Sequence, residues 1–241
     1  MFCFQVTADE AVFVLGIALF YKQGTNSFYN SDSALKRALS LSYQRLLAHQ
    51  SQDGSFTFCQ QETWKTPSTF LTASALDVLR RLQQLEGSKL ALDGLILRKT
   101  VYWLKEQQSL DGSFREKFVF DGIYQRKIPI DFQEIALTSH VLIALSGLSR
   151  HEIQDFNVTS SIEAAAKFLA NRLEILDRSG TSLDIALVAR ALQVSNSPGA
   201  EAAFEILAKN RHEEGKIQRF LNVYWEKCHF WSLLEAEFAA V

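Results

Sequence analysis

The sequence predicts an all-α protein built from helical hairpins, and three observations lead to this prediction. Of the 241 residues only 3 are Pro and 11 are Gly, so few positions interrupt regular structure. The apolar residues between these breakers mostly recur every three or four positions, which is the period of a helix with a buried face. A seven-residue phrase also occurs twice, as QSQDGSF at 50–56 and as QSLDGSF at 108–114, and indicates a repeated unit.

Length and composition limit the class of protein. A hydrophobic content of 47% with 18 Phe suffices for a large core, and we expect residues 1–241 to form a single domain. The formal net charge of -2 argues against a nucleic-acid partner, because neutralising phosphates requires a basic face. The apolar run at 11–21 is too short to cross a bilayer and follows Asp9 and Glu10, so we expect no membrane span and no signal peptide in this chain.

The apolar period places helices along the whole chain, with boundaries defined to within several residues. The predicted helices span 8–21, 33–49, 68–84, 93–107, 132–147, 160–174, 182–194, 199–211 and 229–239. Ser68 or Thr69 is placed to cap the third of these, and Thr159 or Ser160 to cap the sixth, with Glu163 close behind for a capping box.

Two kinds of helix alternate in this series. The helices at 68–84 and 132–147 follow the repeated phrases, open with a Leu-Thr pair and are apolar on almost every side, so we expect them to be buried. A third, looser copy of this pattern lies at 184–194. The helices at 33–49 and 93–107 carry polar residues on one face and are expected outside.

The repeated phrase has a structural explanation. Its Asp-Gly pair turns the chain, because Gly tolerates a positive φ and Asp can accept hydrogen bonds from the amides of the turn. Its Phe is then expected to fill the seam between successive hairpins, where burial contributes about 1.5 to 3 kcal/mol. Repetition of this unit around a circle predicts an α/α toroid, with two concentric rings of helical hairpins. The structural repeat residues are Asp53, Gly54, Phe56, Asp111, Gly112 and Phe114.

The phrase Q-x-x-D-G-S-F at 50–56 and 108–114 also resembles a repeat shared by terpenoid cyclases, protein prenyltransferase β-subunits and the thioester-containing domains of complement and α2-macroglobulin proteins. The flanking stretches are similar, in order and spacing, to the thioester-containing domains of complement components three, four and five. These stretches are YQRLLAHQSQDGSFTF, TPSTFLTASALDVLRRL, WLKEQQSLDGSF and ALTSHVLIALSGL. The resemblance covers roughly residues 8 to 225 and implies a secreted protein, this chain being part of a larger precursor.

The chemistry of that family requires a thioester Cys and Gln separated by Gly-Glu, and usually a His that directs acyl transfer. Near the start, Cys3 and Gln5 stand one residue too close together and lack the Gly-Glu. No His lies between Phe114 and Ala136, where the family would place its own. The resemblance therefore implies a non-catalytic domain without a cofactor, leaning to a member like complement component five. Its partners would be proteins: other domains of the parent protein, or complement or protease-related proteins.

Two other classes of function remain open from the residues. A protein prenyltransferase β-subunit would bind zinc, and Glu226, Cys228 and His229 offer donors, but the pattern departs from the Asp-x-Cys pair of that family. A terpenoid cyclase would need an acidic Asp-x-Asp-Asp run, which this sequence lacks. A generic intracellular helical scaffold is the other alternative. We expect no catalytic and no metal-binding residue, and we interpret His140 as a core histidine.

Two features bear on location and completeness. Asn157-Val158-Thr159 is an acceptor pattern for N-glycosylation, which would imply the secretory route. The similarity fades after Trp225, so we expect residues 226–241 to be divergent or truncated and the toroid to be incomplete at its C-terminal end. The charged and aromatic loop at 115–127 is the first candidate for a contact surface.

Overall fold

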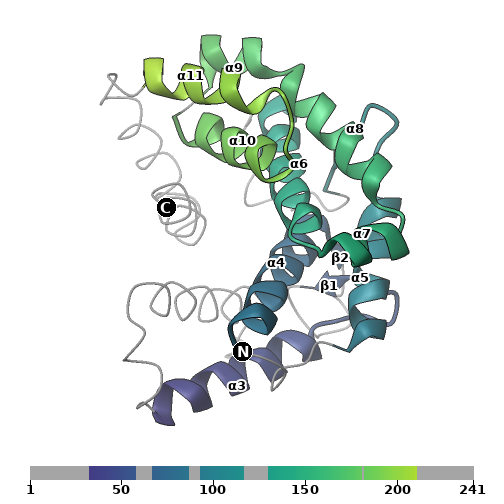
Figure 1. The fold of residues 1–241 in the computed structure, drawn as a ribbon. Helices are drawn as coiled ribbons and strands as arrows, with labels where there is room; N and C mark the ends of the chain where they lie inside the picture. Colours follow the sequence, from purple (N-terminus) through teal and green to yellow (C-terminus); the bar gives the residue numbers. More distant parts are fainter. Residues whose placement is uncertain (1–32, 58–66, 87–92, 117–129, 181, 211–241) are drawn as a thin grey trace, which may run out of the picture. The chain divides into compact units, whose positions relative to one another are not determined.

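The computed structural model describes residues 33–57, 67–86, 93–116, 130–180 and 182–210. Within these ranges the regular structure is helical apart from two short strands, which confirms the all-α fold class (Figure 1). The predicted helices at 8–21 and 229–239, and the predicted incomplete end of the ring, lie outside the described residues. The chain divides into two compact units, Met1–Glu106 and Gln107–Val241. A single domain over residues 1–241 stays a prediction.

The first unit contains three described helices and a small antiparallel strand pair. They are α3 (Ser33–Ala48), β1 (Phe56–Thr57), β2 (Pro67–Ser68), α4 (Thr69–Glu86) and α5 (Gly94–Glu106). In the strand pair, Phe56 lies opposite Ser68 and Thr57 lies opposite Pro67. Helix α4 packs against both β1 and α5. The repeated phrase at 50–56 therefore connects α3 to the strand that leads the chain toward α4.

Helix α4 is buried on nearly every side, as its sequence predicts. Its apolar residues from Leu71 to Leu79 are almost fully removed from solvent. Ser68 caps the helix, because its hydroxyl accepts a hydrogen bond from the backbone N–H of Leu71 at 3.1 Å. Helix α5 instead buries a single face and leaves Leu95 and Tyr102 exposed. The predicted contrast between a buried and a half-exposed helix is thus confirmed in this unit.

The second unit contains the remaining described helices. They are α6 (Ile130–Ser146), α7 (Arg150–Asp155), α8 (Thr159–Ala170), α9 (Leu173–Ser179), α10 (Ser182–Val194) and α11 (Ala200–Asn210). Helix α10 packs against α6, α8, α9 and α11, and α6 also packs against α8. Helices α6 and α10 form the core of this unit, with Val141, Leu142, Val188 and Leu192 fully buried.

Two helix predictions in this unit need correction. The predicted helix at 160–174 is two helices, since α8 ends at Ala170 and α9 begins at Leu173, with Asn171 as the C-cap of α8. Asn is a weaker helix former than the residues around it, because its side chain competes for backbone hydrogen bonds. Helix α7 was not predicted at all. It buries no residue, so it carries none of the apolar periodicity on which the prediction relied.

The predicted cap of α8 by Thr159 or Ser160 is also wrong. The N-cap is Val158, which makes no side-chain hydrogen bond. The reason lies in the preceding turn, where the Asn157 N–H donates to the Gln154 carbonyl and the Val158 N–H donates to the Ile153 carbonyl, both at 3.1 Å. These two bonds form a Schellman motif, which ends α7 and starts α8 without a polar cap.

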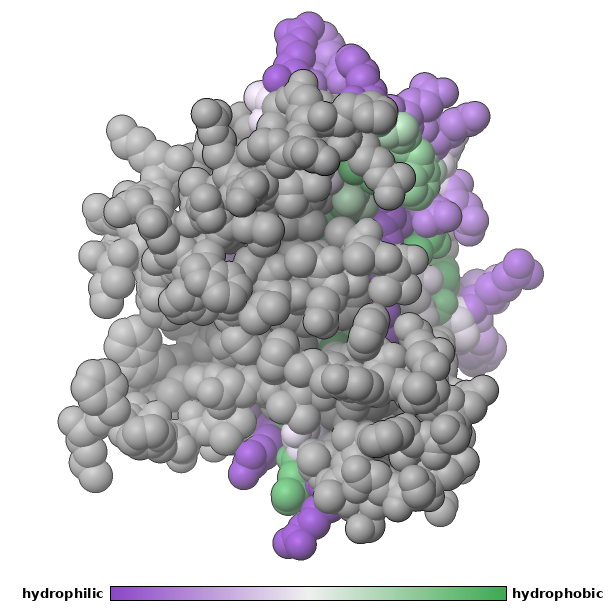
Figure 2. All heavy atoms as spheres, turned by 90° about the vertical axis from the view of Figure 1, so that its left-hand side faces the viewer, coloured by the Kyte–Doolittle hydropathy of each residue, from purple (hydrophilic) through white to green (hydrophobic). Residues whose placement is uncertain are grey.

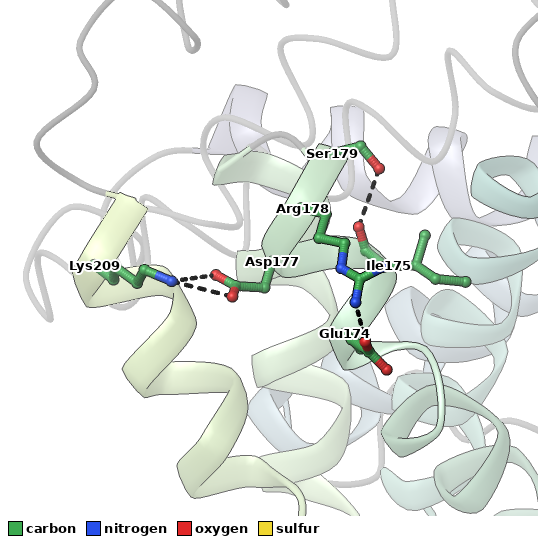
Figure 3. A network of polar contacts seen from close by, with 6 residues as sticks. All are labelled: Glu174, Ile175, Asp177, Arg178, Ser179 and Lys209. Atoms are coloured by element: carbon green, nitrogen blue, oxygen red, sulfur yellow. Dashed lines mark hydrogen bonds and ion pairs between the residues drawn. The ribbon is translucent and has the colours of Figure 1, made fainter.

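Exposed ion pairs lie on α9, and one of them joins this helix to α11. Lys209 of α11 contacts both carboxylate oxygens of Asp177 of α9 at 3.1 Å, and Arg178 pairs with Glu174 within α9 (Figure 3). Figure 2 shows hydrophilic side chains at the top of the view, the end at which Figure 1 places these two helices. Because the pairs are exposed, each contributes at most about 1 kcal/mol. Burial of apolar side chains therefore contributes more to the stability of this unit than these ion pairs do.

No described helix combines the length and the apolar character that crossing a membrane requires.

The capping box of α7 gives a testable prediction. The Ser149 hydroxyl accepts from the Glu152 N–H at 3.3 Å, and the Ser149 N–H donates to the Glu152 carboxylate at 2.8 Å. Ser149→Ala should lower the free energy of unfolding by about 1 kcal/mol in urea titrations, because the first turn of α7 loses its acceptor. Ser160→Ala is the matched control, since Ser160 is exposed in the first turn of α8 and should change little. Equal effects of the two substitutions would contradict this assignment.

Candidate functional site: the two repeated corners

The first repeated phrase folds into a tight corner between residues 50 and 56. The Gly54 N–H donates to the Ser51 carbonyl at 3.0 Å, and the Ser51 N–H donates to the Ser55 carbonyl at 2.8 Å. The Asp53 carboxylate accepts from the Ser55 N–H at 3.0 Å and from its hydroxyl at 2.7 Å. Gly54 has a φ of 97°, in the region that favours glycine. This is the bonding pattern of a short hairpin loop closed by a left-handed residue.

The second corner, at 108–114, repeats this geometry. The Gly112 N–H donates to the Ser109 carbonyl at 3.0 Å, and the Ser109 N–H donates to the Ser113 carbonyl at 2.8 Å. The Asp111 carboxylate again accepts from the N–H and the hydroxyl of Ser113, at 3.0 and 2.7 Å. Gly112 has a φ of 89°. The predicted roles of Asp and Gly in turning the chain therefore describe both corners.

Each corner glycine also lies directly against the next amphipathic helix. A Cβ atom on Gly54 would come closer than 3.0 Å to backbone atoms of Lys99 in α5. A Cβ atom on Gly112 would come equally close to backbone atoms of Ala164 in α8. Glycine is thus required at both positions for two independent reasons, the backbone conformation and the close approach of another helix.

The glutamine that opens each phrase also attaches its corner to the next amphipathic helix. Gln50 donates from its side-chain amide to the Thr100 hydroxyl of α5 at 2.8 Å. Gln108 donates in the same way to the Ser161 carbonyl of α8 at 2.9 Å. Sequence reasoning placed these residues at the ends of helices and gave them no partner. Their presence in both copies of the phrase was the signal that a polar side chain with a partner was required.

The phenylalanine that closes each phrase is fixed to the following buried helix. Phe56 and Phe114 are both 0% exposed. The Phe56 N–H donates to the Thr72 hydroxyl of α4, and the Phe114 N–H donates to the Thr138 hydroxyl of α6, each at 2.9 Å. The Leu-Thr pair noted in the sequence therefore has a function in the fold, since its threonine satisfies a buried backbone donor.

Electrostatics at the corners serve structure rather than reaction chemistry. The Ser113 hydroxyl, and then its backbone N–H, hold the pKa of Asp111 below its ordinary value, with a smaller contribution from the positive charge of Arg115. Arg115 in turn pairs with Glu134 of α6 at 2.9 Å. The aspartate is held ionised by its own turn, and a phenyl ring offers no reactive atom. The corners position helices, and the lowered pKa makes the Asp111 carboxylate a weak proton acceptor toward the Ser113 hydroxyl that is bonded to it.

The other residues singled out in the sequence are spread along the chain. Asn157 is exposed in the turn between α7 and α8, and His140 lies half-buried in α6. The loop at 115–127 is described only as far as residue 116. In the described ranges, no group of three or more His, Cys, Asp or Glu side chains could hold a metal ion. Several candidates lie outside these ranges, namely Cys3, Gln5, Glu226, Cys228 and His229.

The two glycine environments give a prediction with an internal control. Gly112→Ala should lower the free energy of unfolding by at least about 2 kcal/mol, because the new methyl group meets the Ala164 backbone and φ becomes strained. Gly94→Ala, at the start of α5, meets no atom within 4 Å and should change stability by less than about 1 kcal/mol. Urea unfolding followed by circular dichroism measures both. A tolerated Gly112→Ala would rule out the close contact with α8.

A comparison with known families agrees with the corner geometry and with the sequence resemblance. The sequence model of the A-macroglobulin TED domain, the thioester-containing domain of complement proteins, matches residues 12–232, well over half of the chain. The match confirms the predicted superfamily, and the prenyltransferase, cyclase and generic-scaffold alternatives gain no support from it. Domains of this family are α/α toroids, consistent with the all-α structure of both units. This chain belongs to the thioester-containing domain family of the complement and α2-macroglobulin proteins.

Proposed function

We propose that this chain is a non-catalytic protein-interaction module of a secreted complement or macroglobulin-type protein. Its role would lie in innate immunity or protease inhibition, and it would act by contact rather than by acyl transfer. Family membership supports the type of parent protein, since the match spans residues 12–232. The loss of the acylating groups supports the non-catalytic role.

The observation that carries the proposal is the absence of a thioester sequence. A thioester in this family joins a Cys to the Gln three residues later, with Gly and Glu between them. The residues found three positions after the cysteines Cys3, Cys59 and Cys228 are Val6, Glu62 and Trp231. No cysteine of this sequence can therefore form the family's internal ring, and the stretch between Phe114 and Ala136 lacks the His that would direct transfer.

The geometry suits a module that displays contact surfaces. Each corner is attached to a buried helix through its Phe and to an amphipathic helix through its Gln, so the tip of the turn is rigidly held. The tips point to solvent, and Leu110 at the second tip is fully exposed. Turns that a rigid scaffold holds in place are suitable contacts for a protein partner. The first partners to expect are other domains of the same parent protein.

Labelling with a small amine tests the non-catalytic role. The folded chain would be incubated with radiolabelled methylamine, and both protein-bound label and free thiols would be measured. A thioester would incorporate the amine and release a thiol; we expect neither, because no Cys is paired with a Gln at the required spacing. Stoichiometric label that disappears in Cys3→Ala would contradict the proposal, because it would show that a variant thioester forms near the start of the chain.

A further inference from the structure

We propose that Asn157 carries an N-linked glycan, attached before the turn between α7 and α8 closes. The inference rests on the secretory route of the proposed function. Asn157-Val158-Thr159 is the single Asn-x-Ser/Thr triplet with a non-proline centre in the 241 residues. Asn196-Ser197-Pro198 is not an acceptor, because its third residue is Pro. A secreted chain would therefore have one acceptor.

The folded turn leaves room for a sugar on Asn157. The residue has a φ of 51° and is exposed at the C-terminal end of α7. Thr159, which completes the acceptor triplet, is also exposed. Helix α7 buries none of its residues, whereas Phe156 and Val158 on either side of Asn157 are buried and anchor the turn. A glycan here would extend into water without displacing any packed side chain.

Once the turn has folded, the acceptor triplet is no longer accessible to an oligosaccharide transferase. Val158, between the acceptor and the threonine, is 0% exposed. The N–H groups of Asn157 and Val158 are bonded to the Gln154 and Ile153 carbonyls, so the triplet cannot extend without breaking the Schellman motif. A transferase that must surround the acceptor would have to reach it in the unfolded chain. We therefore expect attachment during synthesis and resistance of the folded protein to the same reaction.

The covalent step needs one co-reactant, an oligosaccharide activated as a diphosphate ester. The side-chain amide nitrogen of Asn157 forms a bond to the anomeric carbon of the first sugar. The bond from that carbon to the diphosphate breaks, the diphosphate leaves with the electron pair, and the amide nitrogen loses one proton. No oxidant or reductant is involved.

The fold supplies a matched control in a second turn of the same design. Asn196 has a φ of 54° and is exposed at the end of α10. Its N–H donates to the Gln193 carbonyl at 3.0 Å, and the Ser197 N–H donates to the Leu192 carbonyl at 2.9 Å. Asn196 and Asn157 therefore share conformation, exposure and backbone bonding. They differ in the third residue of the triplet, which is Pro198 in one and Thr159 in the other.

The first experiment tests occupancy. The full chain, fused to a secretory leader, would be expressed in mammalian cells, and secreted and retained material would be treated with an N-glycan amidase. We expect a single glycan, seen as one mobility shift and as conversion of Asn157 to Asp by mass spectrometry. Thr159→Ala should abolish it while retaining Asn157, and Asn157→Gly should abolish it while retaining the positive φ. Pro198→Thr should add a second glycan, at Asn196. Wild-type chain without a glycan in both fractions would overturn the proposal.

The second experiment tests the order of events. Unglycosylated chain from bacteria, either folded or denatured in urea and diluted, would be offered to oligosaccharide transferase with its lipid-linked donor. We expect the denatured chain to be modified at least tenfold more than the folded chain. Equal modification would contradict attachment before turn closure.

The proposal of a secretory location and the proposal of the glycosylation site can be tested separately. If the leader-fused chain is glycosylated but the protein in its native cells is neither exported nor glycosylated, the site stands and the secretory location is wrong.

Discussion

Two buried backbone amides, those of Phe56 and Phe114, constrain much of the rest of the structure. Each amide lies where no water reaches it, and each donates to a threonine hydroxyl on the next buried helix at 2.9 Å. An unpaired donor in such a place would cost about 1 to 3 kcal/mol, so the helix must present its threonine at that point. The phenyl ring is buried with the amide. The corner, the ring and the following helix are thus fixed in one register, and the Gln and Gly of the phrase attach the same corner to the next amphipathic helix.

The third, looser copy of the pattern keeps the apolar spacing but not the threonine. The buried residues Val188, Ala189, Ala191 and Leu192 of α10 follow the spacing of Val141, Leu142, Ala144 and Leu145 of α6. This alignment puts Ile185 in the place of Thr138, and Ile185 is also fully buried. In the chain, helix α9 precedes α10, whereas an Asp-Gly corner and a connecting stretch precede α6. The looser copy thus keeps the apolar spacing of α6 and has an apolar side chain in place of the threonine.

The fold class and most of the helices could be predicted because the repeated phrase and the helical period are both encoded locally. The roles of Asp and Gly in turning the chain follow from residue chemistry, but the partners of Gln50 and Gln108 lie about fifty residues away and are set by packing. The Leu-Thr pair could be seen in the sequence, whereas the bond from Phe114 to Thr138 could not, because every residue other than proline carries the same backbone donor.

Helix α7 was not predicted, because it buries none of its residues and so has no apolar periodicity. The capping box of Ser149 and Glu152 was the one sequence signal that could have identified its start. The family match spans both corners, and no cysteine of the sequence is followed by a Gln three residues later.

Native-state hydrogen exchange measured by NMR tests the protection of the two phenylalanine amides most directly. The amide of Leu110, at an exposed corner tip, provides the reference for fast exchange. We expect the Phe56 and Phe114 amides to exchange as slowly as the slowest amides of α4 and α6, since their release requires the corner to leave the core. Exchange of the two phenylalanine amides at the rate of Leu110 would contradict this expectation.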